Sequence, residues 1–202
     1  MTTTPHAPGP LPPAAVWPPA AELAAKLESV LDAWLSRQSA LAGWDATAAA
    51  LSPAGTDWRA AASRLQLINA FQWREEDRSR EPGAGDATLA AVKRSIDASN
   101  GRRVRAVEEL DTVIVGALEA AGLLNAGAPP PSESPGSIVD RLTVLALKRR
   151  HARDVERLAI LTEQWDDLLG CLDRMGADVA ARKLRVKLYR QVKMYGAGTE
   201  AR

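Results

Sequence analysis

Apolar residues recur at three- and four-residue steps along most of the chain, which is the pattern of amphipathic helices. The first stripe begins near Pro18 or Pro19, because proline is tolerated in the first turn of a helix. Its members are Leu23, Leu27, Val30, Leu31 and Trp34. No segment alternates apolar and polar residues with the β-branched enrichment of a strand. The pattern therefore predicts an all-α fold.

Proline and glycine divide the rest of the pattern into further helices. We expect helices over about 57–80, over 87–121, from Ser134 and Pro135 to about 174, and a last one beyond Gly176 through Lys193. The stretch 43–56 is looser. Short loops favour antiparallel neighbours, so the prediction is a bundle of about five mostly antiparallel helices.

The ends of the chain lack this pattern. Five prolines among residues 1–16 favour a disordered or extended arm, since proline cannot donate to a helix or sheet. The predicted organisation is an arm over 1–16, one helical domain over 17–195 and a flexible tail over 196–202.

Composition narrows the function classes. The 202 residues include 26 basic and 25 acidic side chains, so the net charge of +1 gives no reason to expect nucleic acid or membrane as a partner. The single cysteine, Cys171, excludes a disulfide framework and a multi-cysteine zinc site, and we interpret it as a core residue. No stretch approaches the ~18 apolar residues of a membrane span, and the N-terminus has no secretory signal. The cytoplasm is the default location.

The sequence predicts neither a cofactor nor a metal. It contains no Walker loop and no dinucleotide fingerprint. Glu75, Glu76 and Asp77 are adjacent, but the Glu-x-x-His spacing of di-iron bundles is absent.

Several charged residues fall close to the apolar stripes. At 100° per residue, the predicted third helix places Lys93, Asp97, Asn100 and Asp111 near its packing face. The second helix aligns Asn69, Trp73, Glu76 and Arg80, and the fourth aligns Asp140, Val144, Leu147 and His151 beside Arg141 and Lys148. One interpretation is a set of flanking i,i+4 ion pairs, worth about 0.3–0.5 kcal/mol each. The other is a polar centre between helices, as a structural network or a ligand site.

These residues also carry a resemblance. The runs 73–80, 93–97 and 134–142, with Asn100, Arg103, Glu108 and Asp111 and with 193–195, resemble the bacterial family called domain of unknown function 4254 over about residues 65–195. The resemblance implies a small helical protein. It also suggests a likeness to azinomycin-type pathway relatives, which are linked to aziridine closure by an amine that displaces a sulfate ester.

The sequence departs from the family pattern at three polar clusters. It has Gln72-Trp73-Arg74 in place of Leu-Trp-His, residues 100–105 in place of Asn-Gln-x-Arg-Asn-Asp, and Gly196-Ala197-Gly198 in place of Asn-Asp-Pro. The departures fit a member with a specialised substrate, and they fit equally a non-catalytic partner of an active relative.

Such a ring closure needs cations for the leaving group and a base for the amine proton. The candidate bases are Glu76, Asp97, Glu108 and Asp111. The candidate substrate-binding residues are Trp73, Arg80, Lys93, Arg94, Asn100, Arg103, Asp140, Arg141, Lys148 and Lys193. His151 could also move a proton, but its basic neighbours are more typical of a surface residue.

Two functions follow from these observations. The first is a small-molecule (natural-product) biosynthetic enzyme, or an enzyme subunit, that acts on an anionic, sulfated, amino-acid-type substrate. The alternative is a non-catalytic helical protein that supports a related catalytic chain, so we expect a homo- or hetero-oligomer. The basic run 182–193 would be an amphipathic helix, balanced by the acidic residues before it or available to an anionic partner.

Overall fold

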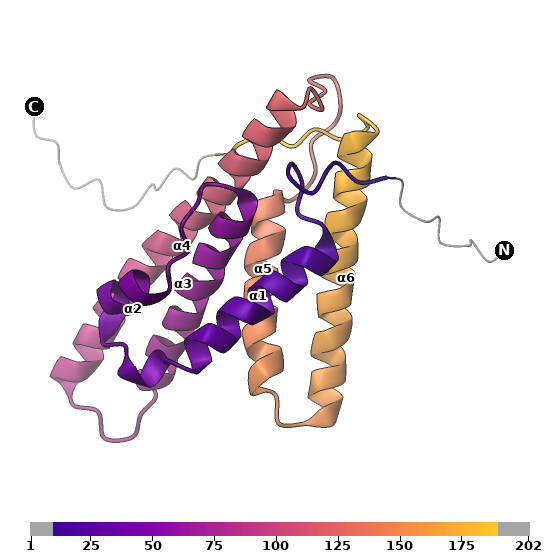
Figure 1. Cartoon of the computed structure of the whole chain (residues 1–202). Coiled ribbons are helices and arrows are strands. Elements are labelled where there is room, and N and C mark those ends of the chain that lie inside the picture. The colour runs from indigo at the N-terminus through magenta and orange to yellow at the C-terminus, as the bar shows by residue number, and fades with distance from the viewer. Residues whose placement is uncertain (1–9, 190–202) are drawn as a thin grey trace, which may run out of the picture.

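The computed structural model describes residues 10–189, and every regular element in that range is helical. The elements are α1 (Ala20–Leu35), α2 (Gly43–Leu51), α3 (Trp58–Arg78), α4 (Asp86–Ala120), α5 (Pro135–His151) and α6 (Val155–Ala180), with a short 3₁₀ turn at Gln38–Ala40. α3 and α4 form one hairpin, α5 and α6 form another, and α1 crosses over both (Figure 1). The prediction of an all-α bundle is confirmed, with six α-helices in the described range.

Side-chain caps set the starts of three helices. Asp57 accepts a hydrogen bond from the Ala60 amide (2.9 Å), Ser134 from the Ser137 amide (3.2 Å), and Asp154 from the Glu156 amide (2.8 Å). Each side chain satisfies an amide that has no partner within its helix. At the end of α4, Gly122 adopts a φ of +66°, and the Leu123 amide donates back to the Leu118 carbonyl. This is the left-handed turn that glycine permits at a helix C-terminus.

The predicted apolar stripes form the core. Leu23, Leu27, Leu31 and Trp34 of α1 are buried, and Phe71 of α3 packs edge-on against the Trp34 ring at a centroid distance of 6.4 Å. α4 contributes its own stripe, with Ile96, Leu110 and Ile114 buried. α5 lies at the centre of the arrangement, since α1, α3, α4 and α6 all pack against it.

The structure differs from the predicted elements at three places. Residues 43–51 form α2, and the expected fourth helix is two helices that separate at 152–154, where Asp154 caps α6. Gly176 does not end a helix: α6 runs through it to Ala180. A Cβ on Gly176 would stand 2.8 Å from two carbons of the buried Trp17 indole, so the glycine makes room for that ring.

The basic segment after α6 is not a helix within the described residues. From 184 to 189 it lies extended along the α4–α5 connection, with Val186 buried. Arg182 donates to the Gly122 carbonyl (2.7 Å) and Arg185 to the Ala126 carbonyl (2.6 Å). These guanidinium groups bind backbone carbonyls at and beyond the C-terminal end of α4, where the helix dipole favours cations.

Part of the predicted arm is packed on the bundle. Pro12 is buried, and the Ala14 carbonyl accepts a hydrogen bond from the Trp58 indole (2.7 Å). Residues 10–16 thus contact the helical bundle, where a disordered or extended arm was expected. Residues 1–9, the tail over 196–202 and Lys193 lie outside the described residues.

Candidate functional site

Three adjoining hollows follow one side of α5, and together we call them the α5 groove. They measure about 220, 400 and 520 Å³. The first and second share Arg103 and Val144, the second and third share Lys148, and the first and third share Trp73. The groove thus runs between α3 and α4 on one side and α6 on the other.

The middle of the groove is held by an ion pair between α4 and α5. Arg103 donates from Nε to Asp140 Oδ1 (2.8 Å) and from Nη2 to Asp140 Oδ2 (2.6 Å), a bidentate pair. The hydrogen bonds that Arg103 donates to Asp140 raise the pKa of the Arg103 guanidinium. Asn69 of α3 donates to Asp140 (2.9 Å) and to Thr143 (2.6 Å), so three helices meet in one network. The predicted polar centre exists here.

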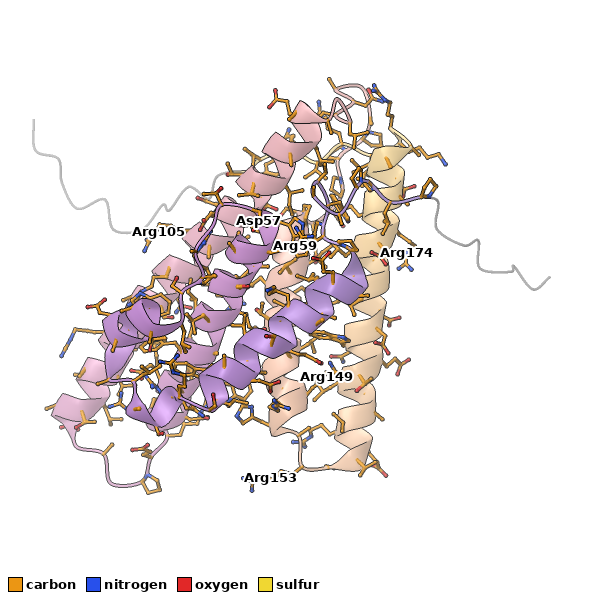
Figure 2. The ribbon with its side chains drawn as sticks, viewed as in Figure 1. Asp57, Arg59, Arg105, Arg149, Arg153 and Arg174 are labelled. Carbon is orange, nitrogen blue, oxygen red and sulfur yellow. The ribbon has the colours of Figure 1, made fainter. Side chains whose placement is uncertain are left out.

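The third hollow is a basic part of the groove. Lys148, Arg153 and Arg157 line it, with Asp154 as its one acidic lining residue and Trp73 and Leu161 among its apolar ones. In the described part of the chain, no carboxylate lies within ion-pair distance (4.0 Å) of Lys148, Arg153 or Arg157. Asp154 accepts from backbone amides at the start of α6. Figure 2 shows Arg153 at the turn between α5 and α6, directed away from the bundle.

The α3 side of the groove carries Glu76 and Arg80. Their nearest charged atoms lie 3.5 Å apart at i,i+4 spacing, and both side chains are partly or largely exposed. Next to them, Gln72 donates to the side-chain oxygen of Asn100 on α4 (2.9 Å). Asn100 therefore borders the groove through Gln72.

Lys93 and Asp97 lie in solvent, so their predicted position near the packing face of the helix is wrong, and Arg94 is exposed as well. Lys93 donates to Asp97 at 2.8 Å, and 69% and 58% of these side chains are exposed. The hydrogen bond that Lys93 donates to Asp97 raises the pKa of Lys93. This pair matches the i,i+4 surface interpretation.

Asp111 lies at the start of α5 and does not line any of the three hollows. It is buried and accepts a hydrogen bond from the Gly136 amide (2.7 Å). Burial raises the pKa of the Asp111 carboxyl, while hydrogen bonds from Ser134 and Gly136 oppose the rise, and the charge of Glu108 adds to it. These contacts explain Asp111 as a cap of α5 and place Glu108 beside that cap.

The Asp111 pKa predicts a pH dependence of stability. Because its folded-state pKa lies above the ordinary value of 3.8, the folded state binds the proton more tightly than the unfolded state does. This contribution to stability is present below 3.8 and is lost as the pH rises through the folded-state pKa. We expect Asp111→Asn to remove this pH-dependent loss of stability, because the asparagine side chain does not titrate. Its amide oxygen can still accept the hydrogen bond from the Gly136 amide. Urea unfolding from pH 3.5 to pH 7 measures it, and parallel curves for both proteins would contradict the assignment.

A fourth hollow, of about 230 Å³, lies between α1, α5 and α6. Its basic residues are already paired: Arg149 with Glu28 (3.3 Å), and Arg150 with Asp32. Lys148, Arg153 and Arg157 of the α5 groove have no such partner among residues 10–189, so the groove is the stronger candidate site.

Several predicted site residues meet in the α5 groove. Those that line it are Trp73, Glu76, Arg80, Arg103, Arg141 and Lys148, with Asp140 bound to Arg103. Sequence reasoning did not single out Arg153 and Arg157. Asp154 was the feature of the sequence that could have indicated them. As a helix-capping residue it predicts a turn at 152–154, beside Arg153 and Arg157.

Within residues 10–189, no group of three or more histidine, cysteine, aspartate or glutamate residues is placed to hold a metal ion. None of the helices in that range is both long enough and apolar enough to cross a bilayer.

Residues 59–157 match the model of a protein family described as protein of unknown function (DUF4254). The match runs from the start of α3 to the start of α6 and includes Trp73, Arg103, Asp140, Lys148 and Arg157. The predicted family is supported over this range, whereas the run 193–195 lies outside it and the azinomycin-type likeness has no support. No curated protein and no solved structure matches the chain.

Proposed function

We propose that this chain, whose residues 59–157 match that family, binds a small organic anion in the α5 groove as a biosynthetic enzyme or an enzyme subunit. The observation that carries the proposal is the third hollow, where Lys148, Arg153 and Arg157 have no carboxylate of residues 10–189 within 4.0 Å and stand near an indole. Cations that protein carboxylates do not neutralise favour an anionic ligand. The Trp73 ring offers apolar contact to the rest of that ligand.

The hollow suits an amino-acid-sized substrate with a sulfate ester, because lysine and arginine both donate to oxyanions. The most specific form of the proposal is aziridine ring closure. The amine nitrogen attacks the carbon that carries the ester, the carbon–oxygen bond breaks, and sulfate leaves toward Lys148 and Arg157. The amine proton passes to a base of the groove. Among the four carboxylates predicted as bases, Glu76 lines the groove.

Serine O-sulfate is the probe that tests anion binding, with unmodified serine as its uncharged-side-chain control. We expect calorimetry to detect the sulfate ester and not serine. Lys148→Gln and Arg157→Gln should each weaken binding by about 10- to 150-fold, because a charge-assisted hydrogen bond contributes about 1.5–3 kcal/mol.

Arg105→Gln is the matched control. Arg105 projects from α4 into solvent and lines none of the hollows (Figure 2). Its loss should leave binding unchanged. Equal weakening by all three variants would mean that only the overall charge attracts the anion, and the groove would not be the site.

A supporting subunit is the second candidate function. Apolar side chains stand exposed on the first turns of α6: Val155 at 82%, Ile160 at 56% and Leu158 at 39%. Exposed apolar clusters favour contact with another chain. This candidate predicts that serine O-sulfate binds a complex with a related helical chain and does not bind this chain alone, which native mass spectrometry and calorimetry of the co-expressed proteins would distinguish.

A further inference from the structure

His151 ends α5 and stands at the wall of the third hollow. Its imidazole stacks on the Trp73 indole, with ring centroids 5.2 Å apart and an interplanar angle of 23°. The stacking joins α5 to α3 and fixes the plane of the imidazole. The ring is nevertheless exposed on the side of the hollow.

One hydrogen bond assigns the protons of this ring. His151 Nδ1 lies 2.8 Å from the Leu147 carbonyl oxygen. A carbonyl oxygen only accepts, so Nδ1 must carry the hydrogen. In the neutral imidazole the lone pair is then on Nε2, the nitrogen that a proton donor can reach. Within residues 10–189, Nε2 has no hydrogen-bond partner.

The groups around the ring fit an acid–base role. Lys148 precedes it on α5, Arg153 and Asp154 lie in the turn, Arg157 comes from α6, and α3 contributes Trp73. Asp154 accepts hydrogen bonds from backbone amides, and among residues 10–189 no carboxylate pairs with the imidazole. An anion bound by Lys148 and Arg157 would bring a negative charge beside the imidazole and favour its protonated form.

We propose that His151 is the acid–base residue of the α5 groove and accepts a proton through Nε2 from the bound anion's own N–H or O–H group. The donor atom of the ligand keeps the electron pair of the broken bond and becomes a nucleophile. The imidazolium that forms keeps its Nδ1–H bond to Leu147. This inference rests on the proposed anion site and names the class of ligand more narrowly: an anion that also carries an exchangeable proton.

The chain contains two histidines, which makes a clean test possible. In the His6→Gln variant, His151 is the only histidine. Nitrogen-15 NMR of this variant at alkaline pH should show Nδ1 protonated and Nε2 unprotonated. The opposite tautomer would overturn the inference without any ligand being present.

A second measurement tests the coupling to the anion with inorganic sulfate as the probe. Calorimetry near pH 7, in buffers of different ionisation enthalpy, measures proton uptake on binding. We expect uptake in the wild type and in His6→Gln, and its complete loss in His151→Gln, which should still bind sulfate through Lys148 and Arg157. If His151→Gln bound sulfate with the same proton uptake as the wild type, the acid–base role of His151 would be overturned and the anion site would stand. No binding to any of the three proteins would overturn the anion site itself, and the inference with it.

Discussion

Replacing Gly136 with alanine should lower the free energy of unfolding by about 2–4 kcal/mol, which is at the upper end of overpacking effects. Gly136 stands in the first turn of α5, close against the backbone of α4. A Cβ there would lie 2.8 Å from the Val107 carbonyl oxygen and 2.8 Å from Asp111 Oδ1. The carbonyl belongs to the interior of α4 and cannot rotate away. The helices would have to separate, and Asp111 would lose the Gly136 amide.

Gly116→Ala is the matched control for this prediction. Gly116 also lies within a helix, but a Cβ there would meet no atom within 4 Å. Alanine should therefore stabilise α4 by about 0.5–1 kcal/mol, because glycine loses more backbone freedom on folding. Urea unfolding followed by circular dichroism measures both variants. A Gly136→Ala protein as stable as the wild type would show that α4 and α5 do not approach this closely.

Asp140→Ala should cost about 2–3 kcal/mol of stability. Removing one partner of a buried ion pair typically costs about 3–5 kcal/mol, and we reduce this because solvent reaches 33% of the Arg103 side chain. Asp140 itself is 15% exposed. Without it, Arg103 keeps a half-buried charge and Asn69 loses one of its acceptors. The substitution therefore removes contacts of α5 with both α3 and α4.

The exposed pair of Lys93 and Asp97 provides the comparison. It has the same charges and a similar distance (2.8 Å), but both side chains lie in solvent. Asp97→Ala should leave the urea midpoint unchanged, since solvent screens such pairs. Equal destabilisation by Asp97→Ala and Asp140→Ala would mean that burial does not distinguish the two pairs.

Much of the fold could be predicted because its helices follow apolar periodicity and strong breakers. Leu23, Leu27 and Leu31 recur with helical spacing, and Gly122 ends α4 as a glycine in a C-terminal turn should. Gly176 misled the prediction. Its role is to accommodate Trp17, a residue about 160 positions earlier in the chain, and local pattern carries no information about such a contact. The helix predicted for residues 182–189 is wrong for a similar reason. Its arginines bind backbone carbonyls that come close to them only in the folded chain.

The site could be predicted in part for the same reason. Rotation by 100° per residue correctly aligned Asn69 with Trp73 on α3, and Asp140 with His151 on α5. It placed Lys93 near the packing face as well, because Lys93 lies at the edge of the α4 stripe, and only the neighbouring helix decides whether an edge position is covered. α5 packs beside Arg103, while Lys93 remains in solvent.

The position of Trp17 against Gly176 has a practical consequence for experiments on immobilised protein. Gly176 lies 21 residues along α6 from Val155, so the packed N-terminal segment is roughly 30 Å from the turn that carries Arg153. The segment after α6 lies at the same far end, bound to the connection between α4 and α5 (Figure 1). A biotin group or a fusion partner attached through either terminal segment would therefore orient the α5–α6 turn away from the support. Ligand capture on a sensor surface should then report on the mouth of the third hollow without steric interference from the tether.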